Sequence, residues 1–233
     1  MRLVVVTTGG AYGRWVVDGL AERGVPVEAV VLDLFRPRPG VALRKPRRLV
    51  GPLRRWLAAR RLATQVVGNL NDRRSVELLR GLAPDLLVLA GARILSAEVL
   101  AVPRLGALNA HPAHLPGFRG TGVVGRSILA GTPVTVTVHF ASAEVDAGDV
   151  VERRLVPIEK GDTLDSIQRR ADALCAEALA DVAARAAAGE ELPREPQAGP
   201  GEVSRWLSAD ERRQAEELVA SGEVRRRYLE ARG

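Results

Sequence analysis

Residues 2–13 read RLVVVTTGGAYG, and this stretch decides the fold. A run of apolar and β-branched residues ends at Thr7, and a glycine-rich turn follows it. The next residues repeat at helical spacing as far as Gly24, and residues 27–32 are again apolar except for Glu28. An apolar strand, a glycine turn, a helix and a second apolar strand indicate a βαβ unit in a parallel sheet covered on both faces. We expect the buried face of the helix to carry Trp15, Val16, Leu20 and Ala21.

The same alternation continues along the chain and predicts an α/β fold with a mostly parallel sheet and helices on both faces. A Gly/Pro/Glu-rich linker follows, and a last helix then gives a short helical C-terminal extension. We therefore predict a catalytic domain over residues 1–190, with the linker and extension over 191–233. We expect strands at Thr64–Val67, Asp85–Leu89, Gly106–Ala110, Thr135–Phe140 and Val150–Pro157, and helices at Asp72–Leu82, Ser96–Ala101, after an N-cap at Asp162, and from Ser208 to Val219.

Composition places the chain among ordinary globular proteins, with 233 residues, 46% apolar and 27% charged. The apolar runs are too short for a membrane span or a secretory signal, so we expect a cytoplasmic protein that does not enter a membrane. Cys175 is the only cysteine, which excludes an internal disulfide, and we expect no metal.

The net charge of +6 comes from one segment, since ten of the 34 basic residues lie between Arg36 and Arg61 without an acidic residue among them. The other 24 basic residues face 28 acidic ones. The segment could bind tRNA or another polyanion. It could equally be a solvated helix with a partial apolar stripe under the arginines. We favour the helix, because Trp56 is the only aromatic residue in the run, and we expect no nucleic-acid partner.

The densest polar cluster is Asn109-Ala-His111-Pro-Ala-His-Leu-Pro-Gly-Phe-Arg119-Gly, directly after a predicted strand. Strand alternation puts Asn109 and His111 on one side of the chain, about 7 Å apart. Asp146 lies in a later small-residue loop that could bring a carboxylate to the histidine, with Asp149 as its rival. An amide, an imidazole and a carboxylate together suit acyl transfer, and the carboxylate would raise the pKa of His111. The alternative is that His111 merely packs under the loop.

A second candidate is the glycine loop, where Gly10, Ala11, Tyr12 and Gly13 follow the first strand. Backbone N–H groups at a helix N-terminus suit an anion, so this loop could belong to an acceptor pocket. A plain tight turn explains it as well.

These motifs resemble those of the folate-dependent formyltransferases, which act on glycinamide ribonucleotide, methionyl-tRNA and amino-sugars. The segment from Leu108 to Gly120 is similar to the family's signature loop, Val134–Val151 to its second motif, and Leu89–Leu95 to a segment whose backbone holds the pterin. The resemblance covers about residues 1–190 and implies a Rossmann-like sheet. It also implies that Asn109 holds the formyl oxygen, that His111 is the acid, and that Asp146 orients and charges His111. For the binding of 10-formyltetrahydrofolate it implies Arg93, Ile94, Leu95, Asn109, Ala143, Glu144, Val145 and Asp146.

This chain differs from the family pattern in the residues that would contact the acceptor. The first loop lacks the serine and asparagine that are typical of glycinamide ribonucleotide enzymes, and Phe118-Arg119-Gly120 is closer to the methionyl-tRNA and amino-sugar branch. Only about 43 residues follow Glu190, and they are helical in pattern, unlike the β-barrel of methionyl-tRNA enzymes. We predict a small-molecule amine acceptor, an amino-sugar or a related metabolite, contacted by the glycine loop and Arg119. The alternative activities are phosphoribosylglycinamide formyl transfer and formyltetrahydrofolate hydrolysis. A homodimer is a possible oligomeric state.

Overall fold

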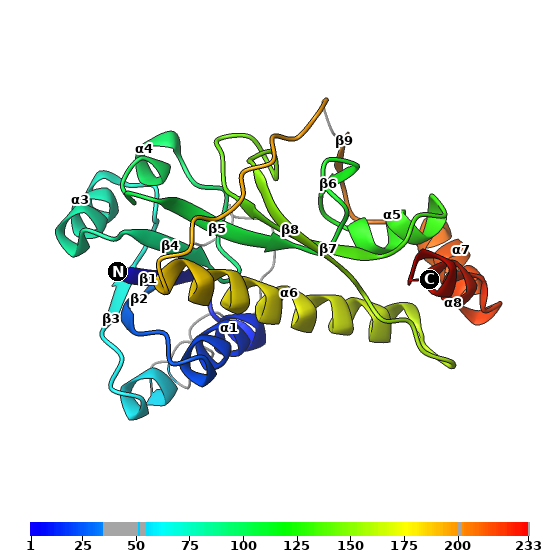
Figure 1. The fold of residues 1–233 in the computed structure, drawn as a ribbon, viewed down its shortest axis with the longest axis horizontal. Coiled ribbons are helices and arrows are strands. Elements are labelled where there is room, and N and C mark those ends of the chain that lie inside the picture. Colours follow the sequence, from blue (N-terminus) through cyan, green and yellow to red (C-terminus); the bar gives the residue numbers. More distant parts are fainter. Residues whose placement is uncertain (35–50, 52–54, 200–201, 233) are drawn as a thin grey trace. The chain divides into compact units, whose positions relative to one another are not determined.

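The computed structural model describes residues 1–34, 51, 55–199 and 202–232. Its main sheet has seven strands in the order β3-β2-β1-β4-β5-β7-β8, of which β1 to β5 pair in parallel and β7 and β8 pair antiparallel (Figure 1). The α/β prediction with a mostly parallel sheet is confirmed. The strands are β1 Leu3–Thr7, β2 Val27–Asp33, β3 Thr64–Val67, β4 Leu86–Leu89, β5 Gly106–His111, β7 Thr135–Phe140 and β8 Val150–Leu155.

The chain groups into two compact units. Unit 1 comprises residues 1–109, 141–143 and 179–192, and unit 2 comprises residues 110–140, 144–178 and 193–233. The predicted boundary after residue 190 falls near the end of unit 1, and the C-terminal helices group with residues 110–140 in unit 2.

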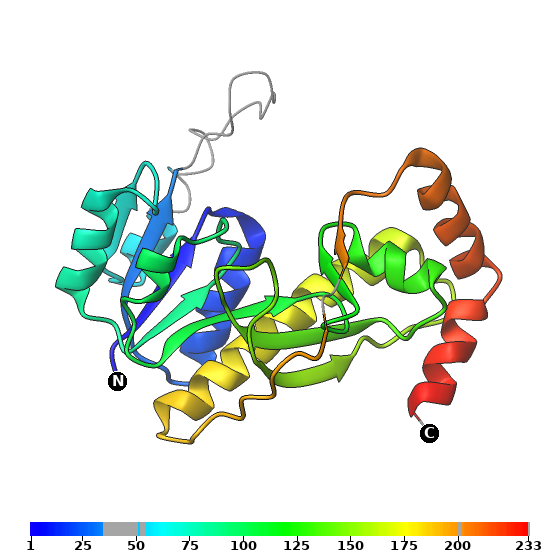
Figure 2. The ribbon, with the colours of Figure 1, turned by 90° about the horizontal axis from the view of Figure 1, so that it is seen from above.

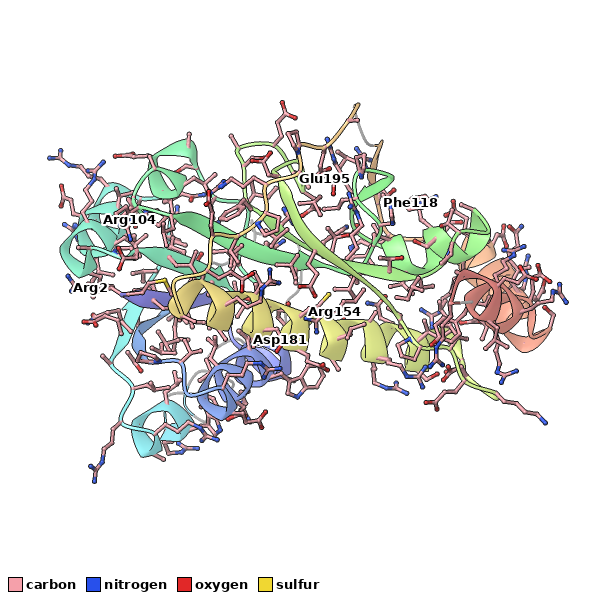
Figure 3. All side chains as sticks on the ribbon, viewed as in Figure 1. Arg2, Arg104, Phe118, Arg154, Asp181 and Glu195 are labelled. Carbon is pink, nitrogen blue, oxygen red and sulfur yellow. The ribbon has the colours of Figure 1, made fainter. Side chains whose placement is uncertain are left out.

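Unit 1 holds β1 to β4 and residues 106–109 of β5, and its central strands are buried because helices cover both faces. One face carries side chains such as Val4, Val6 and Leu87, which pack with α3 (Arg73–Leu82) and α4 (Ala97–Leu100). On the other face, α1 (Gly10–Glu22) contacts the second half of α6 (Leu164–Ala187). Arg23, which follows α1, donates to Asp181 of α6 over 2.6 Å, and Figure 3 labels Asp181 on that helix. Successive side chains of a strand point to opposite faces of the sheet. Because helices cover both faces, both sets of side chains are apolar, and the strand sequences are continuous apolar runs.

Helix α1 buries a different face from the one we predicted. Val16, Val17 and Leu20 are buried, but Trp15 is 43% exposed and Ala21 is exposed as well. The reason lies at Gly13, where an added Cβ would meet the Thr7 Oγ1 at 2.5 Å. The helix lies so close to β1 that its smallest residue must face the strand, and the bulky indole turns outward.

Unit 2 holds β7, β8, α5 (Val123–Leu129), the first half of α6, α7 (Ala209–Ala220) and α8 (Glu223–Arg232). A small parallel pair, β6 (Phe118–Gly120) with β9 (Glu202–Ser204), joins the loop after β5 to the C-terminal segment (Figure 2). Glycines allow this approach, since a Cβ on Gly122 would lie 2.9 Å from the Arg205 carbonyl. Arg126 of α5 also pairs with Glu211 of α7 at 2.9 Å.

Two helix starts test the capping predictions. Ser208 caps α7 in a full capping box with Glu211, as we expected. The predicted N-cap at Asp162 is wrong, because the Thr163 Oγ1 accepts the Ser166 N–H over 3.1 Å. Asp162 instead pairs with Arg170 at 2.6 Å, a charge-assisted bond that holds the pKa of Asp162 at about 2. The last element, α8, was not predicted as a separate helix.

Candidate active site

His111 is the last residue of β5 and is buried, with 6% of its surface exposed. Its Nε2 lies 3.0 Å from the Phe118 carbonyl oxygen, and its Nδ1 lies 3.5 Å from the Asp146 Oδ2. Both ring nitrogens therefore face acceptors. A neutral imidazole has one N–H and satisfies one of them, whereas an imidazolium satisfies both. These two acceptors therefore stabilise the protonated ring, in opposition to the burial of the side chain.

Asp146 is held in an unusual backbone conformation, with a φ of 48°. A residue other than glycine adopts this left-handed region at a cost of roughly 1–3 kcal/mol and keeps it only where its surroundings fix it. Here the Gly120 N–H donates to the Asp146 Oδ2 over 2.9 Å. The Gln197 amide donates to the carbonyls of Asp146 and Gly148 over 2.9 and 2.7 Å. These contacts direct the carboxylate toward His111.

A second histidine lies on the other side of the same carboxylate. The His139 Nε2 is 3.7 Å from the Asp146 Oδ1, and its Nδ1 is 2.9 Å from the Phe140 carbonyl. His139 is almost completely buried. His139 is therefore a buried, hydrogen-bonded neighbour of the Asp146 carboxylate.

Burial dominates the acidity of both imidazoles. It lowers the pKa of His111 below the usual 6.5, although the Asp146 charge and the Phe118 carbonyl act in the opposite direction. The pKa of His139 is lowered for the same reason. We expected Asp146 to raise the pKa of His111 and to keep the ring charged. Its contribution has that sign, but desolvation outweighs it, so the resting imidazole is neutral at pH 7.

The other predicted site residues differ in how they relate to the His111–Asp146 pair. Asn109 precedes His111 by two residues on β5. Arg119, which we predicted to contact the acceptor, is buried and donates to the Gln197 Oε1 over 3.0 Å. Asp149, the rival carboxylate, pairs with Arg194 at 3.8 Å. Sequence analysis missed Gln197, because it lies in the Pro/Glu-rich stretch that we interpreted as a linker.

The predicted folate-binding segment, Arg93 to Leu95, belongs to unit 1 and is held by two asparagines that we did not predict. Asn69 accepts a hydrogen bond from the Arg93 guanidinium. The Asn71 amide donates to the Ile94 carbonyl over 3.0 Å and accepts from the Ser96 N–H over 2.9 Å. The Ile94 side chain is 66% exposed, which suits an apolar contact with a flat ring. The signal in the sequence that could have indicated these asparagines is the polar run Asn69-Leu-Asn-Asp72, which follows the strand at Thr64–Val67.

The glycine loop, with Gly10, Ala11, Tyr12 and Gly13, forms the start of α1. Gly9 precedes the helix with a φ of 98° and without a side-chain cap. The Thr7 Oγ1 accepts the Gly9 N–H over 3.0 Å. Gly13 has a packing role against Thr7, and the acceptor role of the loop stays a prediction.

Most of the arginine-rich run, residues 35–50 and 52–54, lies outside the described residues. Of the described arginines, Arg60 pairs with Asp18 at 2.8 Å, and its guanidinium lies 3.9 Å above the Trp56 ring. Within the described chain there is no group of three His, Cys, Asp or Glu side chains that could hold a metal. The described helices include none with the length and apolarity that a bilayer crossing needs.

Comparison with known proteins gives one family. Residues 1–183 match the family described as Formyl transferase. The methionyl-tRNA formyltransferase of Anaeromyxobacter dehalogenans (strain 2CP-C) is 30% identical over 223 residues, which are 94% of this chain and 70% of that protein.

Solved structures give the same fold. Glycinamide ribonucleotide transformylase 1 from Symbiobacterium toebii is 25% identical, with a TM-score of 0.65 over 84% of this chain and 93% of that one. A sugar N-formyltransferase from Shewanella sp FDAARGOS_354 is 17% identical and has a TM-score of 0.67. That match covers 94% of this chain and 87% of the other.

Proposed function

The chain belongs to the formyl transferase family and is a formyl-transferring enzyme that uses formyl-tetrahydrofolate, and from this premise we propose an acceptor and residue roles. We propose that it transfers the formyl group of 10-formyltetrahydrofolate directly to the primary amine of a small molecule, an amino-sugar or a related metabolite. The observation that carries the residue roles is the buried His111, with Asp146 on one ring nitrogen and a carbonyl on the other.

The proposed reaction needs one proton to move from the acceptor amine to the folate. The amine nitrogen attacks the formyl carbon, a C–N bond forms, and the carbonyl electron pair moves to oxygen. His111 is neutral at rest and takes the proton that the amine loses, on the nitrogen that does not face Asp146. The imidazolium then donates this proton to the folate N10 as the C–N10 bond breaks. The substrate must displace the Phe118 carbonyl from His111 for this exchange.

Two neighbours support the histidine in this proposal. Asp146 accepts the Nδ1–H and stabilises the imidazolium while it exists. Asn109 donates its amide N–H to the oxyanion. This hydrogen bond strengthens as negative charge develops on the oxygen. Arg93, Ile94 and Leu95, with the loop from Ala143 to Asp146, would hold the folate, which supplies the formyl carbon. The fixed carbonyl and exposed side chain of Ile94 fit such a ligand.

A second acceptor, methionyl-tRNA, is favoured by a specific finding. A relative at 30% identity, matched over 94% of this chain, is a methionyl-tRNA formyltransferase. Against it stands the engagement of one described arginine of the basic run, since Arg60 contacts Asp18 and Trp56 of its own chain. The same assay with both acceptors separates the two.

The residue roles are tested by His111→Ala, with His114→Ala as the matched control because His114 is exposed. We expect His111→Ala to lower formyl transfer by about two to four orders of magnitude, the usual contribution of an acid–base group. The affinity for 10-formyltetrahydrofolate, measured by calorimetry, should stay nearly unchanged. A His111→Ala enzyme with a rate close to that of the control would contradict the proposal.

A further inference from the structure

A pocket of about 450 Å³ lies entirely within unit 2 and is separate from the predicted folate segment. Three parts of the chain form its walls. They are the turn that leads from β6 into α5, one face of α6, and the segment between β9 and the first turns of α7. This volume is in the range of small-molecule sites, about 300–1,000 Å³.

The pocket shares a wall with the His111–Asp146 pair. Pro112, which lines the pocket, directly follows His111 in the chain. Gly120, which also lines it, donates its N–H to the Asp146 Oδ2 over 2.9 Å. The pocket therefore adjoins the pair through Pro112 and Gly120, although neither His111 nor Asp146 lines it.

The α6 wall carries hydrogen-bonding groups at four-residue spacing, which places them on one helix face. Gln168 donates its amide to the Asp172 Oδ1 over 2.9 Å, so the two side chains present one amide oxygen and one carboxylate together. Asp172 is half-buried, and burial raises its pKa. Among the described residues no arginine or lysine pairs with this carboxylate. The half-buried Asp172 carboxylate keeps acceptor capacity beyond its bond from Gln168, so it can accept hydrogen bonds from hydroxyl or ammonium groups of a ligand.

The segment after β9 and the start of α7 add an indole surface and an ion-paired guanidinium to the lining. Trp206 lines the pocket and is 78% exposed. Arg212 lines it too, but its guanidinium is bound to Asp165 and to Glu216, each at 2.8 Å. The pocket walls thus carry two carboxylates against one paired guanidinium, which disfavours phosphate. An indole face with carboxylate and amide groups suits a ring that is apolar on its faces and hydroxylated at its edge.

We infer that this pocket binds the hydroxylated ring of the acceptor amine, with Asp172 and Gln168 bonded to its hydroxyl groups and the Trp206 indole against its face. The inference rests on the proposed function and deepens it, because it identifies the ligand of this pocket as a sugar ring that carries the reacting amine. Asp172, Gln168 and Trp206 are then the residues that determine acceptor specificity.

The test measures binding and turnover separately. Pyranose sugars with the amine at C2, C3 or C4 are titrated into the full chain and followed by ligand-observed NMR, in wild type, Asp172→Asn and Trp206→Ala. Glu177→Gln is the control, since Glu177 lies on the same helix but outside the pocket. Glucose tests the ring alone and inorganic phosphate tests the anion.

At least one amino-sugar should bind wild type and Glu177→Gln equally, and glucose should compete with it while phosphate should not. Loss of a hydrogen bond to a charged group should weaken binding about 10- to 100-fold in Asp172→Asn. Loss of the aromatic face should weaken it about 2- to 10-fold in Trp206→Ala, whose exposed position leaves the fold intact. Absence of amino-sugar binding to wild type would overturn the inference. An affinity for the amino-sugar in both Asp172→Asn and Trp206→Ala that equals the wild-type affinity would overturn it as well.

Formyl transfer from 10-formyltetrahydrofolate to the bound sugar distinguishes the two proposals. Binding that is lost in the pocket variants, without any transfer by wild type, would contradict the proposed function alone. Transfer whose KM for the amino-sugar is unchanged in Asp172→Asn would contradict the pocket assignment alone.

Discussion

At the scale of single residues, the chemistry depends on how little water reaches His111. Burial lowers the pKa of the ring and makes the neutral form the resting state, while Asp146 makes the protonated form attainable once a proton arrives. A base that is neutral at rest and stabilised after protonation suits a reaction in which the proton comes from the attacking amine. We therefore propose that the histidine and the carboxylate work as a pair.

The choice of carboxylate can be tested with two matched changes. Asp146→Asn removes the charge beside His111 and should lower kcat by about two to four orders of magnitude. Asp149→Asn removes only the pairing with Arg194, an exposed contact of little energetic weight, and should leave kcat within about twofold. Steady-state rates of both variants decide this, and the reverse order of effects would show that Asp149 is the functional carboxylate.

The protonation argument predicts a pH dependence. Because the pKa of His111 is lowered in the folded protein, the neutral ring stabilises the fold above the unfolded pKa of about 6.5. That stability should decline as the pH falls from 6.5 through the folded pKa. NMR titration of the His111 ring should give a midpoint below 6.5, and a still lower one in Asp146→Asn, since Asp146 raises this pKa. A midpoint above 6.5 in wild type would contradict the account.

At the scale of elements, the segment from residue 193 onward belongs to unit 2 and contacts the candidate site. Glu195 forms a bridge with Val150 of β8, Gln197 braces the Asp146 backbone, and β9 pairs with β6. Its last residues then lie against the glycines at the start of α5. The stretch that looked like a linker therefore braces the Asp146 loop through Gln197, and Trp206 and Leu207, which come after it, line the pocket.

Gly122→Ala tests this packing. The added Cβ would lie 2.9 Å from the Arg205 carbonyl, at a residue whose φ is 71°. Gly161→Ala is the control, because it has the same backbone strain, with a φ of 83°, but nothing within 4 Å. Both should lose about 1 kcal/mol through strain. Only Gly122→Ala should lose further stability and show faster hydrogen exchange over residues 202–220, and equal behaviour of the two would contradict the packing described.

The elements differ in how far the sequence predicts them. Strands β3 and β7 have the predicted bounds, because β-branched runs between turn residues carry a local signal. Helix α5 was not predicted, since seven residues among glycines have too little periodicity. The sequence placed Asn109, His111 and Asp146 as candidates by residue type. The geometry that joins Asp146 to His111 depends on Gln197, which lies 51 residues farther along the chain and which no local pattern indicates.

At the scale of the whole molecule, the net charge of +6 raises the question of a nucleic-acid partner. Of the described arginines of the basic run, Arg60 pairs with Asp18 and stacks on Trp56. Unit 2 offers a pocket whose carboxylates disfavour phosphate. Both features agree with a small-molecule acceptor. Because a relative is a methionyl-tRNA formyltransferase, methionyl-tRNA is the second acceptor to test.

Simultaneous change of Arg55, Arg60 and Arg61 to Ala tests the role of the charge. We expect kcat/KM for the amino-sugar to stay within about twofold, because these side chains lie outside the pocket and surface pairs contribute little. Binding of tRNA, measured by filter retention across salt concentrations, should be weak before and after the change. A large loss of affinity with a reduced salt slope would show that the run binds phosphates.

The central claim is formyl transfer to a small-molecule amine, and one measurement tests it most directly. The full chain is incubated with 10-formyltetrahydrofolate and, in separate reactions, an amino-sugar panel, glycinamide ribonucleotide, methionyl-tRNA or no acceptor, and release of tetrahydrofolate is followed. The account predicts release that depends on an amino-sugar and is lost in His111→Ala. Efficient formylation of methionyl-tRNA or glycinamide ribonucleotide without any reaction of the amino-sugars, or release at the same rate without an acceptor, would contradict it.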